Sequence, residues 1–154
     1  MMAKSLKFIG AYWGPREQDF ESVVRCIVEF MIKIKDFDLI FDIDYYETAR
    51  VKKEALRNPI IINDYESVYN WLKKGEKNEI INSQIGLSKS FWGLLKGGNS
   101  LKISFTLGSL SKVNQNVFYI DFELPVFNGE KEKIRKLTAL FNEFWDTDRI
   151  KLNI

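Results

Sequence analysis

The architecture of this chain follows from residues 83–124, which read SQIGLSKSFWGLLKGGNSLKISFTLGSLSKVNQNVFYIDFEL. Two segments of this region alternate between apolar and polar side chains, as strands with one buried face do. Their apolar members are Leu101, Ile103, Phe105 and Leu107, then Phe118, Ile120, Phe122 and Leu124. Residues 85–95 and the turn Gly97-Gly98-Asn99 precede them and add a further strand. The region therefore predicts an antiparallel β-sheet meander with one apolar and one polar face.

Two long amphipathic helices are predicted around this meander, at residues 19–35 and 130–145. In the first, apolar residues recur at helical spacing from Phe20 to Ile34, and Asp19 is suited to be the N-cap. Both helices are expected to pack on the apolar face of the sheet. The chain of 154 residues thus predicts a single α+β domain spanning residues 1–154.

Other elements are predicted from shorter patterns. Residues 6–13 form a strand with Leu6, Phe8 and Tyr12 on one face and Ile9, Ala11 and Trp13 on the other. Residues 37–46 alternate as an edge strand, and residues 51–57 allow a helical turn. Asn63 and Glu66 have capping-box spacing before a short helix. Residues 150–154 alternate as a closing strand.

Composition narrows the functional classes. The chain has 23 basic and 21 acidic residues, a net charge of +2, which gives no overall attraction to nucleic acid or to anionic membranes. It has no histidine, which excludes serine–histidine and cysteine–histidine catalysis and histidine metal sites. Cys26 is the single cysteine and lies in an apolar helical pattern, where a thiol usually packs as a small hydrophobe. No metal, cofactor or catalytic residue is expected.

The N-terminal residues and the lengths of the apolar runs predict a cytoplasmic protein. Residues 1–6 lack the apolar core and cleavage site of a secretory signal. No run of the sequence approaches the ~20 apolar residues that cross a bilayer, so no membrane partner is expected.

An acidic and aromatic cluster lies in the middle of the chain. Its members are Asp36, Asp38, Asp42, Asp44, Tyr45, Tyr46 and Glu47. On a strand, Asp42 and Asp44 would point the same way, as a carboxylate pair for a cation or for acid–base chemistry must. The cluster also fits a tyrosine-rich patch that recognises a basic partner, or a solvated strand edge.

Three short motifs follow one another in this chain. They are Tyr12-Trp13-Gly14-Pro15-Arg16 at the end of the first strand, KEALRNP at residues 53–59, and Ser90-Phe91-Trp92-Gly93 in the meander. In this order, the motifs resemble the immunity-protein-52-like family of bacterial polymorphic toxin systems, from Phe8 to about residue 124. Where the family pattern has Trp-Asn-Gly, this chain has Trp92 followed directly by Gly93, and the asparagine is missing.

The resemblance implies a non-enzymatic protein that binds and neutralises a cognate toxin encoded nearby. The motif residues Tyr12, Trp13, Gly14, Arg16, Ser90, Trp92 and Gly93 are expected to be structural. Two surfaces are candidates for the toxin contact: the polar sheet face, with Lys102, Thr106, Tyr119, Asp121 and Glu123, and the Asp42–Glu47 patch, whose Asp42, Asp44, Tyr45, Tyr46 and Glu47 would suit a basic nuclease. The alternatives are a small enzyme that uses Asp42 and Asp44, and a scaffold domain that self-associates through residues 149–154.

Overall fold

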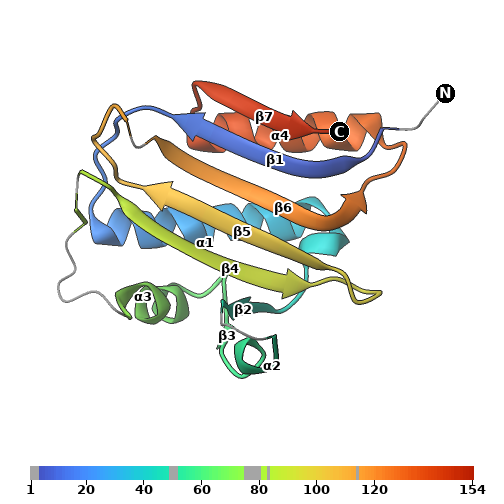
Figure 1. Cartoon of the computed structure of the whole chain (residues 1–154), viewed down its shortest axis with the longest axis horizontal. Helices are drawn as coiled ribbons and strands as arrows, with labels where there is room; N and C mark the ends of the chain where they lie inside the picture. The colour runs from blue at the N-terminus through green and yellow to red at the C-terminus, as the bar shows by residue number, and fades with distance from the viewer. Residues whose placement is uncertain (1–3, 49–51, 75–80, 83, 114) are drawn as a thin grey trace.

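The computed structural model describes residues 4–48, 52–74, 81–82, 84–113 and 115–154. Its centre is a seven-stranded sheet (Figure 1). The strands are β1 (Leu6–Trp13), β2 (Tyr45–Glu47), β3 (Pro59–Ile60), β4 (Leu87–Leu94), β5 (Ser100–Leu107), β6 (Asn116–Val126) and β7 (Arg149–Asn153). Every neighbouring pair runs antiparallel, so the predicted α+β class and antiparallel sheet are confirmed.

The strand order differs from a simple meander. Across the sheet it is β3-β2-β4-β5-β6-β1-β7. The strands of residues 83–124 lie side by side as β4, β5 and β6, but β1 is inserted between β6 and β7. The sequence does not reveal this insertion, because pairing between distant segments leaves no local pattern.

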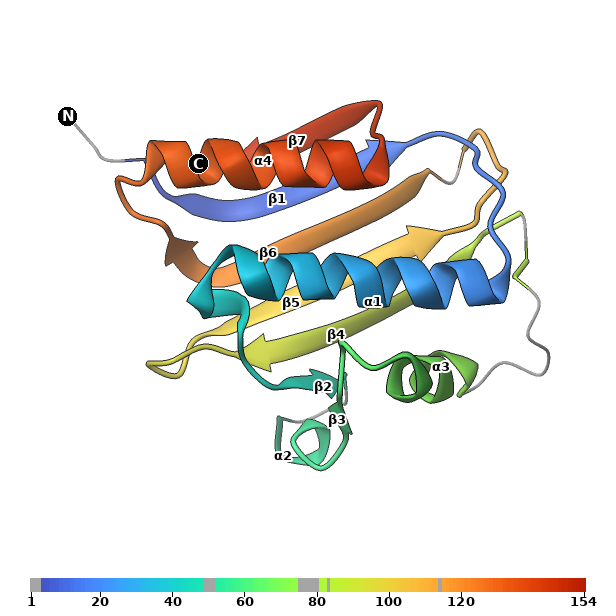
Figure 2. The same ribbon diagram turned by 180° about the vertical axis from the view of Figure 1, so that it is seen from behind.

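The helices are α1 (Phe20–Phe37), the 3-10 helix η1 (Leu39–Phe41), α2 (Lys52–Ala55), α3 (Tyr65–Lys73) and α4 (Lys131–Trp145). Helices α1 and α4 cross the same face of the sheet and lie behind the strands in Figure 1, in front of them in Figure 2. Asp19 caps α1, as predicted, by accepting from the Ser22 amide at 2.8 Å. Among the described helices, none has the length and apolar composition that a membrane crossing requires.

Phe30 of α1 holds the layers together. Its ring packs edge-on against Phe118 of β6, with 4.9 Å between centroids, and against Phe141 of α4, at 5.0 Å. All three side chains are fully buried. Burial of each such ring contributes on the order of 2–3 kcal/mol, so this cluster fixes α1 and α4 on the sheet.

Helix α3 lies beside β4 and packs against α1 (Figure 2). The Trp71 ring meets Phe91 of β4 at a centroid distance of 5.4 Å. The N-cap is Asp64, whose carboxylate accepts from the Ser67 amide at 3.0 Å. The prediction of Asn63 as the cap is therefore wrong by one residue.

Residues 37–46 do not form the predicted edge strand. Helix α1 extends to residue 37, η1 follows, and β2 begins only at Tyr45. Asp38 holds this segment to α4, because its carboxylate lies 2.7 Å from Lys133 Nζ. Phe41 is fully buried, with its ring 6.2 Å from that of Phe122. These tertiary contacts override the alternation that predicted a strand.

Strand β1 pairs with β6 through an irregularity that changes which side chains are buried. Its register with β6 shifts between Leu6 and Phe8, as a β-bulge does. Leu6 is therefore fully buried instead of sharing a face with Phe8 and Tyr12. Phe8 and Tyr12 stay together, partly exposed, on the face without helices.

Candidate functional site

The helix-free face of the sheet gathers aromatic side chains from four strands. Tyr46 of β2 and Trp92 of β4 lie 5.3 Å apart between ring centroids, and Phe8 of β1 lies at the same distance from Tyr119 of β6. Tyr12 of β1 stands beside this second pair. All five side chains are partly exposed. Because half-exposed aromatic rings are enriched at protein interfaces, this face is the first candidate for a binding surface.

Gly10 lets three of these rings pack together. A Cβ atom at this position would lie 3.0 Å from ring carbons of both Phe8 and Tyr12. Tyr119 stands directly opposite Gly10 on β6. Phe8, Tyr12 and Tyr119 thus lie side by side across a residue without a side chain, and we refer to these three rings as the aromatic strip.

Two cations from β7 border the aromatic strip. The Arg149 Cζ atom lies 5.2 Å from the centroid of the Tyr12 ring, and Lys151 Nζ lies 5.3 Å from it. Both residues are exposed. Partial burial raises the pKa of Tyr12, Tyr119 raises it further, and Arg149 opposes the shift. We refer to Arg149 and Lys151 as the cationic rim.

The acids predicted on this face are engaged locally. Asp121 forms an ion pair with Lys7, at 3.2 Å. Glu123 accepts from the Ser100 amide at 2.8 Å, which fixes the start of β5. Lys102 is exposed opposite Asp121. Of the predicted polar face, Tyr119 is therefore the residue that the structure joins to an aromatic cluster.

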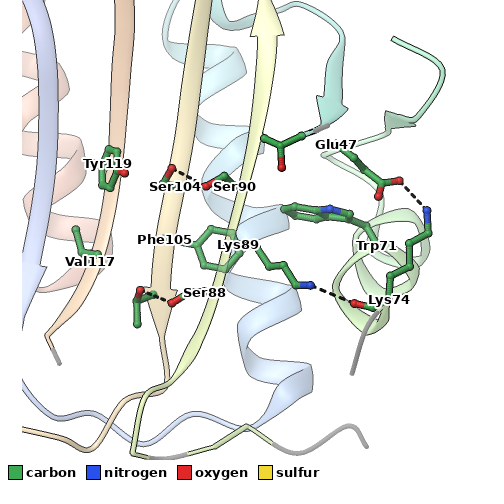
Figure 3. A pocket seen from close by; sticks show the side chains of 12 residues that line it. Glu47, Trp71, Lys74, Ser88, Lys89, Ser90, Ser104, Phe105, Val117 and Tyr119 are labelled. Carbon is green, nitrogen blue, oxygen red and sulfur yellow. Dashed lines mark hydrogen bonds and ion pairs between the residues drawn. The ribbon is translucent and has the colours of Figure 1, made fainter. Parts of the chain in front are cut away.

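A hollow of about 540 Å³ opens where β4, β5 and α3 meet (Figure 3). Two hydroxyl pairs lie on its strands. Ser88 and Thr106 are 2.6 Å apart, and Ser90 and Ser104 are 2.8 Å apart. The hollow continues the polar part of the helix-free face, with Tyr119 at one end.

The charged groups around this hollow bond one another. Lys74 Nζ lies 2.8 Å from a Glu47 carboxylate oxygen, and Lys89 Nζ donates to the Lys74 carbonyl at 3.1 Å (Figure 3). A nucleophilic hydroxyl needs a base within about 3 Å, whereas the Ser88 hydroxyl pairs with Thr106 and the Ser90 hydroxyl pairs with Ser104. The hollow thus offers hydrogen bonds to a partner, and these four hydroxyls do not have the geometry of an activated nucleophile.

The acidic and aromatic cluster is divided among different environments. Tyr45 is buried, donates to the Phe41 carbonyl at 3.0 Å and belongs to the core, so it is not available to a partner. Tyr46 joins the helix-free face, and Glu47 pairs with Lys74. Asp42 is exposed and lies 3.9 Å from Lys35. In the described parts of the chain, no three acidic or cysteine side chains gather as a metal site would require.

Asp42 and Asp44 precede β2 instead of standing on a strand, so the geometry expected for a carboxylate pair is wrong. Asp42 borders an apolar hollow of about 400 Å³ near η1 instead. Leu39 and Leu124 on its lining are 83% and 54% exposed. This hollow is not predictable from the sequence, because the alternation in residues 37–46 predicts a strand where η1 forms.

The first motif ties β1 to the end of α4. Trp13 stacks on Trp145, with 5.2 Å between centroids and an angle of 13° between planes. Gly14 donates to a carboxylate oxygen of Asp148 at 2.9 Å. Arg16 lies over Trp13 and donates to the carbonyls of Trp145 and Asp146, at 2.6 and 2.7 Å. The structural role expected of Trp13, Gly14 and Arg16 agrees with these contacts.

The third motif belongs to β4, which lies between β2 and β5. Gly93 is buried opposite Tyr45, and a Cβ there would lie 2.6 Å from Ile43 Cδ1 and 3.0 Å from a Tyr45 ring carbon. Trp92 donates from Nε1 to the Glu47 carbonyl at 3.3 Å. Gly93 is therefore structural, whereas Trp92 both pairs β4 to β2 and exposes part of its ring.

Cys26 packs against the core from α1, as predicted. Burial raises the pKa of its thiol, which keeps the sulfur protonated near neutral pH.

No family model, no curated protein and no solved structure matches this chain. The resemblance to the immunity-protein-52-like family therefore stays a prediction from the motifs.

Proposed function

We propose that this protein binds a cognate toxin domain encoded nearby and neutralises it by covering its active site with the helix-free sheet face. The observation that supports this proposal most directly is the set of partly exposed aromatic rings on that face: Phe8, Tyr12, Tyr46, Trp92 and Tyr119. Aromatic side chains dominate the binding energy of protein interfaces. The family resemblance supplies the class of partner.

The face is close in size to one side of such a complex. Five neighbouring strands, spaced about 4.8 Å apart and about eight residues long, present roughly 600 Å² in projection. A stable protein complex buries about 800 Å² on each partner. The side chains at the rim and in the 540 Å³ hollow supply the remaining contact area.

The sheet face is a better candidate than the Asp42–Glu47 patch. Tyr45 is in the core, Glu47 is held by Lys74, and Asp42 lies near Lys35. The patch therefore presents less net negative charge than the sequence suggests. A rigid sheet also loses little conformational entropy on binding, which favours a tight complex.

Calorimetric titration with the C-terminal domain of the toxin-like protein encoded beside this chain tests the proposal. We expect a 1:1 complex with a dissociation constant in the nanomolar range or below, and loss of toxin activity at equivalence. Tyr119→Ala should weaken it at least tenfold, whereas Ala139→Ser on exposed α4 should leave it unchanged. No heat and no protection would overturn the proposal.

The position of β7 favours a second candidate, self-association. β7 is an outer strand of the sheet, and Leu152 and Ile154 are 38% and 53% exposed. An outer strand offers backbone groups to a second copy. Sedimentation over a hundredfold range of concentration tests it: a constant monomer mass excludes the scaffold function.

A further inference from the structure

We infer that the helix-free face binds its partner mainly at its β1–β7 end. There the aromatic strip and the cationic rim contact an acidic surface of the partner. This inference rests on the proposed function and names the chemistry of the toxin surface. It departs from the basic partner that the acidic cluster suggested from sequence. The contact residues at this end are Phe8, Tyr12, Tyr119, Arg149 and Lys151.

The cationic rim is free to bind carboxylates. Arg149 and Lys151 are exposed, and among the described residues neither forms an ion pair. Their side chains lie over the Tyr12 ring, which orients them without consuming a carboxylate. A guanidinium held against a ring keeps its N–H donors available for bidentate binding of a carboxylate.

The charge balance of the face points the same way. Asp121 is neutralised by Lys7, and Glu123 is bound by the Ser100 amide. Lys102 is exposed on the same face and is, like the rim, without an ion pair among the described residues. The helix-free face therefore presents an excess of positive charge within a chain of nearly balanced charge, and an acidic surface is electrostatically complementary to it.

The aromatic strip strengthens these contacts. Phe8, Tyr12 and Tyr119 form an apolar surface around Gly10. A partner that docks on this surface excludes water from it. A charge-assisted hydrogen bond at the border of such an apolar surface is shielded from water and is therefore stronger. Tyrosine and arginine are among the residues that most often carry the affinity of an interface.

Charge reversal on β7 tests the inference. We would compare Arg149→Glu/Lys151→Glu with Lys131→Glu/Lys136→Glu, which reverses two exposed lysines of α4 on the opposite side of the sheet. With the toxin-like domain, the β7 variant should associate about tenfold more slowly or worse, and with a weaker salt dependence. The α4 control should stay within about twofold of the parent protein.

Further variants keep the test decisive. If the β7 reversal unfolds the protein, Arg149→Gln/Lys151→Gln should still slow association, by about threefold. Tyr12→Ser should raise the dissociation rate more than it lowers the association rate, because it removes one ring of the aromatic strip and no charge. Equal association rates for the parent and both β7 variants, or faster association after charge reversal, would overturn the inference while leaving the proposed function intact.

Model anions separate the two proposals. Fluorescence anisotropy with labelled poly-L-glutamate at low salt should show binding that the β7 reversal abolishes and the α4 control retains. That result supports the acidic-surface inference even where the toxin-like domain fails to bind and the proposed function falls. Tighter binding of a single-stranded oligonucleotide than of poly-L-glutamate would overturn the inference in favour of a nucleic-acid surface.

Discussion

Arg16 connects two segments of the chain that are far apart in sequence. Its guanidinium lies over Trp13 and donates to the last carbonyls of α4, at Trp145 and Asp146. A helix leaves these carbonyls without partners, and a cation there also complements the helix dipole. Asp146 takes the left-handed conformation that ends the helix, with φ of 48°. Arg16 is therefore a C-terminal cap supplied by another element.

Replacement of Arg16 with alanine should lower the free energy of unfolding by about 2–3 kcal/mol, because two charge-assisted hydrogen bonds are lost. Arg16→Lys keeps the charge but not the planar fork and should lose about half as much. Urea unfolding followed by tryptophan fluorescence measures both. A change under about 0.5 kcal/mol in Arg16→Ala would mean that solvent replaces the cap.

Tyr45 gives a prediction about alkaline pH. Burial raises its pKa far above the usual 10.0, and the nearby Asp42 adds to the shift. Above pH 10 the unfolded chain releases this proton while the folded protein keeps it. The stability is therefore complete below about pH 10 and falls as the pH rises beyond it.

Tyr45→Phe should separate two effects. Near pH 8 it should cost about 1 kcal/mol, because the Phe41 carbonyl loses its donor. Between about pH 9 and pH 11 the variant should lose less stability than the parent, since this proton no longer contributes. Urea unfolding across that range measures both slopes, and identical slopes would exclude Tyr45 as the main group. Tyr12, whose pKa is also raised, contributes part of the remaining slope.

At the scale of elements, the start of α3 is decided by one residue. Asp64 accepts from the Ser67 amide, whereas Asn63 lies just outside the helix and is exposed. Asp64→Ala should cost about 1 kcal/mol of stability, and Asn63→Ala should change it by less than about 0.3 kcal/mol. Thermal unfolding of the two variants makes the comparison. A larger loss of stability in Asn63→Ala than in Asp64→Ala would mean that Asn63, which the capping-box spacing indicated, is the N-cap of α3.

Elements with a strong internal pattern are predictable from this sequence. The stripe from Phe20 to Ile34 and the alternation in β5 and β6 predict α1 and two strands at nearly their true bounds. The strand predicted for residues 37–46 is wrong, because the alternation of Phe41, Ile43 and Tyr45 resembles a strand while the segment folds mainly as the end of α1 and η1. Their structure depends on Asp38 meeting Lys133 from α4, a contact that no local pattern contains.

The candidate surface was only partly predictable for the same reason. The alternation of β5 and β6 places Lys102, Thr106 and Tyr119 on a polar face, as expected. The aromatic strip and the cationic rim depend on β1 lying between β6 and β7. Arg149 stands beside Tyr12 through this pairing alone, although the two residues come from opposite ends of the chain.

At the scale of the whole molecule, this pairing of the two ends has a consequence for folding. Gly14 and Asn116 are 102 residues apart in sequence and joined by a hydrogen bond of 2.8 Å, and Trp13 stacks on Trp145. Closing such long loops costs entropy before the contacts that offset it are made. Contacts of this kind place folding in the range of milliseconds to seconds.

The Trp13–Trp145 stack offers a direct probe of that step. In a Trp71→Phe/Trp92→Phe background, which leaves these two as the remaining tryptophans of the chain, stopped-flow fluorescence should show the stack forming over milliseconds to seconds. The far-UV signal of helix should develop earlier, because helix hydrogen bonds join residues only four apart in sequence. A further Trp145→Phe change should remove the slow fluorescence phase and keep the helix signal. Formation of the stack within the dead time of mixing would mean that the two end segments meet first. Strand β1 would then join the sheet early in folding instead of last.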